Sequence, residues 1–403
     1  MHLRHLELEQ FRAYSKLDLP LAAAGLRLRG ANASGKSSLV EAVVMLATTR
    51  SPRSGSERET IRHGSGEDLG VPPFARIRGV VERNEDSIEL EIGLQVDPRR
   101  PGLVRKTIRL NGRPVRSIDA VGQFKAVLFS PEDVALVSGS PAARRRYLDL
   151  TISQVNAGYL RALSRYGRVL EQRNSLLKAL QRDRVDPTGS LATGQLAFWD
   201  EELLLHGCAI IVGRAGTIQR LALLARDQYR RLAGGELAVA YRPALDLDGV
   251  GERSQGEPGV MQATVRREFV RALAERRSEE VRRGVTVVGP HRDDLAFGAD
   301  GMDLGVYGSR GQQRLAVVAL KLAETELMTE AAGEAPVLLL DDVLSELDLS
   351  HRRQLEDAAV RIEAQAIVTG TDASEWTGSA LDRLPGAALQ AGSIVADARA
   401  GEG

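Results

Sequence analysis

Residues 30–38 of the chain read GANASGKSS, and this stretch decides the fold. It matches the pattern G-x-x-x-x-G-K-[ST], in which glycines let backbone N–H groups turn inward around phosphate oxygens. Lys36 supplies a mobile positive charge, and the Ser37 hydroxyl is suited to bind Mg²⁺. Residues 26–28 predict a strand and residues 39–46 a helix, whose positive N-terminal end would face the anion. The order strand, glycine loop, helix predicts a nucleotide-binding α/β fold.

The composition makes a chance match improbable. The chain has 40 glycines, but only six of its 54 basic residues are lysines, and one stands at the motif position. We therefore expect the loop to bind the phosphates of a nucleotide. The residues expected to contact it are Gly30, Ala31, Asn32, Ala33, Ser34, Gly35, Lys36, Ser37 and Ser38.

A second candidate element is the apolar run 337–340, which ends in Asp341 and Asp342. A buried strand that carries a carboxylate at its end, beside the phosphate loop, is where a Mg²⁺ partner belongs. We expect Asp341 to hold the Mg²⁺ shell and Asp342 to orient or deprotonate the attacking water. Alone, two acids at a strand end are also compatible with a solvated turn. The loop at residues 30–38 is what favours the catalytic interpretation.

Composition limits the remaining classes. The chain has 403 residues, 43% hydrophobic and 27% charged, and its net charge is zero. These values predict two globular lobes and exclude a rod, wholesale disorder and a globally basic nucleic-acid binder, although a local basic patch is still allowed. The single Cys208 permits no internal disulfide. No leader segment and no membrane span is expected, so the predicted location is cytoplasmic.

The secondary structure predicted along the chain changes in character twice. Residues 75–117 are rich in strands, with a hairpin at Asn111-Gly112, which predicts an antiparallel β subdomain. Between 142 and 284 the pattern is helical, and a seam of alternating fours and threes includes Arg173 at one position. We expect helices over 194–233 and 264–283. The predicted domains are a discontinuous ATPase head, 1–141 and 285–403, and an inserted helical domain, 142–284.

After residue 284 the α/β pattern returns. Residues 286–288 and 366–368 predict short strands, and residues 311–328 predict an amphipathic helix. The final residues, 397–403, are expected to fray.

Eight blocks of sequence resemble a known family. They are residues 11–14 (FRAY), 30–38, 129–133 (FSPED), 139–141 (GSP), 144–149 (RRRYLD), 289–295 (GPHRDDL), 309–314 (SRGQQR) and 340–348 (LDDVLSELD). Their combination, spread over nearly the whole length, resembles the RecF family of bacterial recombination mediators. These are ATPases of the cassette (ABC) and chromosome-maintenance (SMC) type. The implied fold is an α/β ABC/SMC-like P-loop ATPase head with an antiparallel β subdomain and an inserted, short coiled-coil-like helical domain.

The resemblance also implies a mechanism. Two heads dimerise around ATP, with Lys36, Asp341 and Asp342 as catalytic residues and with Ser37 and Asp341 as Mg²⁺ ligands. The residues implied to contact the nucleotide of the partner subunit are Ser309, Gly311 and Gln312. Residues 345–348 are implied to lie at the same interface.

The implied function is a clamp for DNA. The ATP-bound homodimer binds double-stranded and gapped DNA and helps RecO and RecR to load RecA, and weak, DNA-stimulated hydrolysis releases it. Roles in DNA replication, DNA repair and the SOS response are implied as well. No membrane partner is implied.

Several positions depart from related ATPases. Ala33 stands where the family more often has glycine, which should restrict the loop geometry, and we expect the fold to tolerate it. Asp342 is shorter than the glutamate of cassette transporters, and no histidine occurs in the turn 369–372. The place of the glutamine loop is not assigned by the sequence, with Ser130 and Glu132 as candidates.

Two sets of arginines have open interpretations. Residues 144–146 either contact phosphates or form salt bridges on a helix face. Arg161, Arg165 and Arg168 lie four and three residues apart on one helix face, which suits either DNA phosphates or a polar helix flank.

His291 lacks the partners of a metal site and is expected to pack or to form hydrogen bonds.

Two other function classes compete with the clamp. A transport-motor subunit would need a membrane partner, and the helical insert, the missing histidine and Asp342 argue against it. The other is an interaction protein with an ATP site that serves only as a structural switch. The intact residues Lys36, Ser37, Asp341 and Asp342 argue against complete loss of hydrolysis, but not against very low turnover.

Overall fold

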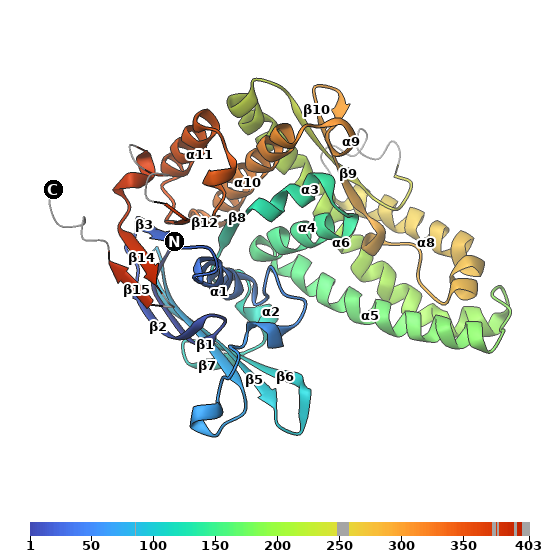
Figure 1. Cartoon of the computed structure of the whole chain (residues 1–403). Helices are drawn as coiled ribbons and strands as arrows, with labels where there is room; N and C mark the ends of the chain where they lie inside the picture. The colour runs from blue at the N-terminus through green and yellow to red at the C-terminus, as the bar shows by residue number, and fades with distance from the viewer. Residues whose placement is uncertain (85, 248–257, 373–375, 377–378, 391–392, 397–403) are drawn as a thin grey trace. The chain divides into compact units, whose positions relative to one another are not determined.

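The computed structural model describes residues 1–396, apart from residue 85 and residues 248–257, 373–375, 377–378 and 391–392 (Figure 1). The segment 397–403, which was expected to fray, lies outside the described residues.

The chain divides into two compact units. The head unit comprises residues 1–134, 227–234 and 314–403, and the helical unit comprises residues 135–226 and 235–313. These units differ from the predicted domains mainly in residues 285–313, which group with the helical unit. The domain boundaries expected from the sequence stay a prediction.

The head unit contains a six-stranded sheet in the order β15-β14-β3-β13-β12-β8. All neighbours are parallel except β14 and β15. Its strands are β3 (Gly25–Arg29), β8 (Ala126–Phe129), β12 (Val337–Asp341), β13 (Ala366–Gly370), β14 (Gly386–Gln390) and β15 (Ser393–Ala396). Every residue of β12 and β13 is buried, as expected for apolar runs in the middle of a parallel sheet. The predicted strands 26–28, 337–340 and 366–368 are confirmed.

A second sheet of the head unit is antiparallel, in the order β2-β1-β4-β5-β6-β7. Its strands are β1 (His2–Phe11), β2 (Tyr14–Pro20), β4 (Phe74–Arg83), β5 (Asp86–Asp97), β6 (Arg100–Leu110) and β7 (Arg113–Val115). The turn between β6 and β7 is the predicted hairpin. Asn111 and Gly112 both have positive φ, 50° and 73°, as a two-residue hairpin turn requires.

Helix α1 (Lys36–Thr48) lies between the two sheets. It contacts β4 and β5 on one side and β8, β12 and β13 on the other. Its apolar residues are therefore buried all round, and they join the strands in one hydrophobic core. The head unit also holds α2 (Ser117–Ala120), α11 (Leu349–Arg361) and residues 314–332 of α10 (Arg310–Ala332).

The helical unit is built on long helices, as the change in predicted secondary structure indicated. Its helices are α3 (Ala135–Ser138), α4 (Pro141–Val155), α5 (Ala157–Arg182), residues 190–226 of α6 (Ser190–Ala233), α8 (Pro258–Arg283) and α9 (Leu304–Tyr307). A small antiparallel sheet joins β9 (Leu237–Arg242), β10 (Asp294–Ala299) and β11 (Met302–Asp303).

The predicted seam runs along α5 and contains one charged residue. Tyr159, Tyr166, Leu177 and Leu180 are buried, and Arg173 is fully buried among them. The Arg173 guanidinium donates to carboxylates of α6 and α8 and to a threonine. These partners are Asp200 (2.9 Å), Glu280 (2.6 Å) and the Thr286 hydroxyl (2.8 Å). Burial of this charge is tolerated because its donors have partners.

The predicted strand 286–288 is wrong, because side chains bind the backbone there. The Thr286 N–H donates to the Asn174 amide oxygen (2.8 Å), and the Val287 N–H donates to the Glu280 carboxylate (2.9 Å). These side chains take the donors that a sheet would use, so the segment is irregular.

His291 forms hydrogen bonds, as expected, and both of its ring nitrogens are used. Nδ1 lies 2.7 Å from the Tyr166 hydroxyl, and Nε2 lies 3.1 Å from the Thr286 carbonyl. A neutral imidazole fits this arrangement, with Nε2–H as donor and Nδ1 as acceptor. Burial accordingly lowers the pKa of His291 from 6.5 to about 4.

We expect acid to destabilise the fold through His291. Because its pKa is lower in the folded chain than in the unfolded chain, its contribution is complete above pH 6.5 and is lost as the pH falls toward 4. The full effect is about 3 kcal/mol. Melting temperatures measured from pH 7 to pH 4 should fall more steeply for the parent chain than for His291→Gln. Parallel curves for the two proteins would contradict this assignment.

One helix of the described chain is long and apolar enough to span a bilayer by length and composition. An 18-residue window of α6 has a mean hydropathy of 1.4, and 44% of that window is buried inside the structure. A core helix passes the same test, so this single helix is weak support for a membrane span.

Candidate nucleotide-binding site

The head unit brings the glycine loop and Asp341 together through the order of its strands. The loop follows β3 and Asp341 ends β12, and β13 lies between them in the sheet. In the register of the sheet, Asp341 is paired with Thr369 of β13, and Thr369 is paired with Leu28 of β3. Parallel strands end at the same edge, so the two motifs meet there although 304 residues separate Ser37 from Asp341. The Ser37 hydroxyl donates to Asp341 Oδ1 across 3.1 Å.

The loop wraps around the end of the Lys36 side chain. Lys36 Nζ donates to the carbonyls of Gly30 (2.7 Å) and Ala31 (3.2 Å). Gly35 has φ 113° and stands immediately before α1, a conformation that favours glycine. The loop therefore places an ammonium group and a helix N-terminus at one point, which suits an anion.

Ala33 adopts the left-handed conformation, with φ 64°. An L-residue with a Cβ pays about 1–2 kcal/mol there relative to ordinary backbone. The loop closes nonetheless, as expected for this departure from the family pattern.

The Asp341 carboxylate is almost fully buried and receives three donors. Besides Ser37, the Thr369 hydroxyl donates to Oδ1 (2.8 Å) and Arg53 Nη2 donates to Oδ2 (2.6 Å). A buried carboxylate is stable only with hydrogen bonds and a cation, and Arg53 supplies the positive charge. Arg53 also lies 3.9 Å from Glu132.

Arg53 is a residue of the site that the sequence did not predict. Arg53 stands in residues 50–56 (RSPRSGS), which contain two arginines. The segment has no periodic pattern or motif that identifies either arginine as an ion-pair partner of Asp341. The contact depends on the strand order, since 288 residues separate the pair.

Asp342 lies directly after β12 in the left-handed region, with φ 52°, where aspartate is among the better tolerated residues. Its N–H donates to the Thr369 hydroxyl (3.1 Å), and its carbonyl accepts from Ser345 (2.8 Å). The turn is thus held by its backbone. A role of its side chain toward water stays a prediction.

The candidate glutamine-loop residues follow β8, the neighbour of β12. The Ser130 N–H donates to Asp133 (2.7 Å), and burial raises the pKa of the Asp133 carboxyl. Lys321 of α10 is buried beside this aspartate and donates to Glu324 (2.7 Å). Burial would lower the pKa of Lys321, but the carboxylates of Glu324 and Asp133 outweigh it and raise that pKa. The segment is therefore anchored, while its role toward a nucleotide is not assigned.

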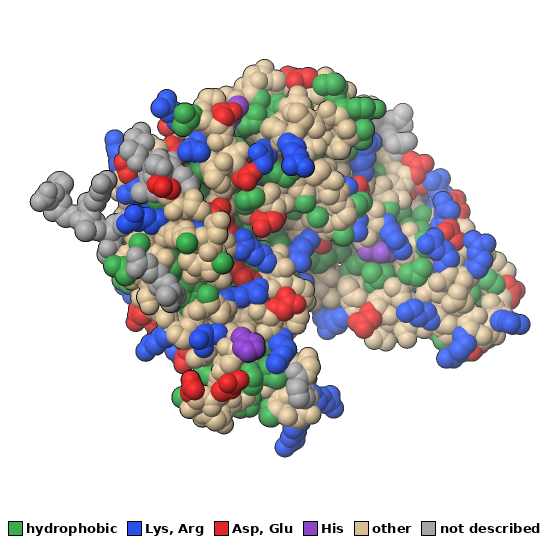
Figure 2. All heavy atoms as spheres, viewed as in Figure 1, with side chains coloured by type: hydrophobic (Ala, Val, Ile, Leu, Met, Phe, Trp, Pro, Cys, Tyr) green, Lys and Arg blue, Asp and Glu red, His purple; other side chains and the backbone are tan. Residues whose placement is uncertain are grey.

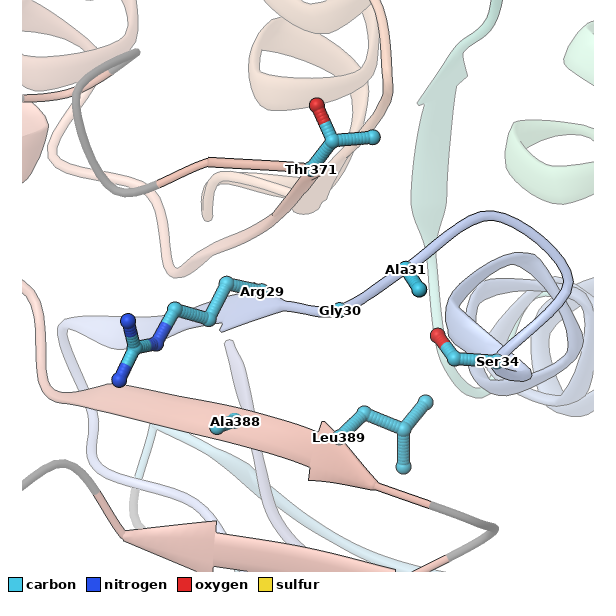
Figure 3. A pocket seen from close by; sticks show the side chains of 7 residues that line it. All are labelled: Arg29, Gly30, Ala31, Ser34, Thr371, Ala388 and Leu389. Carbon is cyan, nitrogen blue, oxygen red and sulfur yellow. The ribbon is translucent and has the colours of Figure 1, made fainter.

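A hollow of about 400 Å³ opens beside the loop (Figure 3). It is lined by Arg29, Gly30, Ala31, Ser34, Thr371, Ala388 and Leu389. The Ser34 hydroxyl is buried there and has no hydrogen-bond partner among the described residues. The loop thus has an open side, and one polar group beside it has an unused hydrogen-bonding capacity among the described residues.

Ser309, Gly311 and Gln312 belong to the helical unit. The Ser309 hydroxyl accepts from the Gln312 N–H (3.2 Å), and the Gln312 side chain accepts from the Ser309 N–H (2.9 Å). This reciprocal pair is a capping box at the start of α10. Ser309 and Gly311 are exposed and Gln312 is half-buried, so the turn is accessible to another molecule.

Arg144 and Arg145 are held by partners within the helical unit. Arg144 is buried and forms a two-bond ion pair with Asp294 (2.6 and 2.9 Å), and Arg145 donates to the Asp293 carbonyl (2.7 Å). The salt-bridge interpretation holds for Arg144, and Arg145 is tied to the backbone.

A parallel sheet with the loop after β3, the acid after β12 and an antiparallel sheet behind α1 defines the ATPase head of the ABC/SMC class. The family described as "RecF/RecN/SMC N terminal domain" matches residues 2–393. The chain belongs to the RecF family.

Curated relatives and solved structures agree. "DNA replication and repair protein RecF" of Chloroflexus aggregans is 44% identical, over 94% of this chain and 95% of the relative. The protein of that name from Thermomicrobium roseum is 45% identical, over 96% and 97%. The structure "recombination mediator protein RecF-ATP in RecFOR pathway" has a TM-score of 0.82 and 28% identity, covering 98% of both chains. An Smc head bound to a ScpA domain reaches 0.53 at 16% identity, which shows the fold alone.

Proposed function

We propose that the chain is an ATP-dependent DNA-binding ATPase of recombinational DNA repair. The observation that carries the proposal is the pairing of Ser37 with Asp341 across the sheet edge, 3.1 Å apart. It places a phosphate loop and an acidic strand in the relation that ATP hydrolysis requires. The names of the relatives add DNA replication and repair, and the solved RecF structure adds ATP and the RecFOR pathway.

Residues of the head have distinct proposed roles. Lys36 is bound to the β- and γ-phosphates, and the backbone of residues 30–38 surrounds them. Asp342 orients the attacking water or takes its proton. Hydrolysis is weak and stimulated by DNA, as the family resemblance implies.

Ser37 and Asp341 fit a Mg²⁺ ion. Hydroxyl and carboxylate oxygens are the hard ligands that Mg²⁺ takes together with substrate phosphates. Within the described ranges no group of three His, Cys, Asp or Glu side chains could hold a metal, which is consistent with phosphates completing the set. When bound, the ion would neutralise charge on the phosphates. Arg53 donates to the same Asp341 carboxylate. When the ion is bound, the Arg53 guanidinium would therefore either share this carboxylate with the ion or move away from it.

The proposed active form is a homodimer. Ser309, Gly311 and Gln312 of one subunit contact the nucleotide held by the other, and residues 345–348 lie at that interface. The exposure of Ser309 and Gly311 supports this assignment.

The dimer binds duplex and gapped DNA, acts with RecR, RecO and RecA, and is located in the cytoplasm. Slow hydrolysis releases the DNA. The transport-motor alternative has no observation of its own in the described structure beyond the apolar helix α6.

Binding of labelled duplex DNA, measured by fluorescence anisotropy at fixed moderate salt, tests this function. We expect binding with ATP, weaker binding with ADP and little without nucleotide, because only ATP would join the two heads. Equal binding in all three conditions would separate the ATP site from DNA. No binding in any condition would refute the proposed function for the chain acting alone.

A further inference from the structure

The helical unit carries a row of exposed arginines on α5. Arg161, Arg165 and Arg168 are spaced four and three residues apart, so they lie on one helix face. All three are exposed, whereas Tyr166 and Arg173, on another face of α5, are buried. We call these three residues the α5 arginine row.

The part of the chain that the structure describes does not neutralise the row. Among the described residues, no carboxylate lies within 4.0 Å of any of the three guanidinium groups. Arg168 makes one long hydrogen bond, 3.4 Å, to the carbonyl of Ser164 in its own helix. Residues 157–170 of α5 contain no acid, and Glu171 is the first.

The arginines of α8 in the same unit behave differently. Arg267 pairs with Glu268 (3.1 Å), Arg271 pairs with Glu268 (2.9 Å), and Arg276 pairs with Glu279 (3.1 Å). Exposed arginines on α8 are thus matched by neighbouring acids, and those of the α5 row are not. Figure 2 shows basic side chains, with acidic ones between them, over the part of the surface where α5 and α8 lie in Figure 1.

Because the net charge of the chain is zero, attraction to a polyanion has to come from such a local excess. The row spans eight residues, and the seven steps between its ends correspond to about 10 Å along the helix axis. A DNA strand carries one phosphate per about 3.4 Å of axis, so the row matches about three phosphates in length and in charge. Guanidinium groups also suit phosphate oxygens through paired N–H bonds.

We propose that the α5 arginine row binds the phosphate backbone of duplex DNA. This inference rests on the proposed function and names the surface that performs the DNA binding. The contact is independent of base sequence, since it involves phosphates only.

The test compares two triple variants of the full chain. One is Arg161→Gln, Arg165→Gln, Arg168→Gln. The control is Arg267→Gln, Arg271→Gln, Arg276→Gln on α8. Both variants lower the net charge by three, so a difference between them reports position and not total charge. Circular dichroism and melting temperature verify that the helices persist.

Duplex binding with ATP is measured by anisotropy from 50 to 200 mM salt. Three phosphate contacts give a salt slope of about 2.7 for each row that contacts the duplex, so for each such row the parent should lose about 40-fold more affinity over this range than the α5 variant does. The α8 control should keep the slope of the parent. A lysine version of the α5 variant should restore most of the slope, because it retains the charge.

An unchanged slope in the α5 variant would overturn the proposal, and so would an equal loss in the α8 control. Intact DNA binding combined with loss of an acidic protein partner would assign the row to that partner instead. If the parent chain itself binds no duplex with ATP, the proposed function fails, which is distinct from failure of the row alone.

Discussion

Replacing Lys36 by alanine should abolish ATP binding and, with it, binding of DNA. Lys36 Nζ is surrounded by loop carbonyls at 2.7 and 3.2 Å and is the ammonium group at the N-terminus of α1. Hydrogen bonds to charged groups contribute about 1.5–3 kcal/mol each, so loss of contacts to two phosphates should weaken ATP at least about 100-fold. Titration with a fluorescent ATP analogue measures the loss, and the duplex assay measures its consequence.

Lys16→Ala is a matched control for this variant. Lys16 is an exposed lysine of β2 in the same unit, and no ion pair to it is found in the described structure. It should bind ATP like the parent. If Lys36→Ala still bound DNA in an ATP-dependent manner, the glycine loop would not be the nucleotide site that controls the clamp.

The phosphate loop and the acidic strand could be predicted because each is a local pattern. A strand, a glycine loop and a helix occupy only residues 25–48, and the apolar run before Asp341 identifies a buried strand without any partner being known. Their meeting point required one further rule, that parallel strands end at a common edge.

Arg53 shows why the rest of the site could not be predicted. Arg53 meets its partner Asp341 only because the strands are arranged in the order β3-β13-β12. No local pattern in the sequence specifies that order. The short edge strand β8 was missed for a related reason, since four residues carry too little periodicity to mark a strand.

In the helical unit, a local pattern was predicted but the partners of its residues were not. The seam pattern on α5 was correct at Tyr159, Tyr166, Leu177 and Leu180, whereas its other two leucines, Leu163 and Leu170, are only half-buried. A seam position occupied by Arg173 would not be expected to be fully buried. Its burial depends on Asp200 and Glu280 from two other helices. The same Glu280 binds the backbone at Val287 and prevents the strand that the β-branched residues 286–288 suggested.

The second large effect is expected at Ser309, which should act across the dimer. Ser309→Arg places a long side chain at an exposed turn that is proposed to contact the nucleotide of the partner subunit. We expect it to block ATP-dependent dimerisation while each subunit still binds ATP, because the residues of the phosphate loop are unchanged. Light scattering after size-exclusion chromatography, with and without ATP, measures the mass, and the fluorescent analogue measures nucleotide binding.

The capping box requires a separate control, since Ser309 also caps α10 through Gln312. Loss of the cap alone costs about 1 kcal/mol, which is too little to unfold a helix of 23 residues that is packed in the head. Ser309→Asn retains a cap without the added bulk and should keep most of the dimer. An equal defect in both variants would assign the residue to the helix cap and not to the interface. A normal ATP-dependent dimer of Ser309→Arg would exclude the proposed contact with the partner's nucleotide, because an arginine could not fit between a phosphate and the helix that faces it.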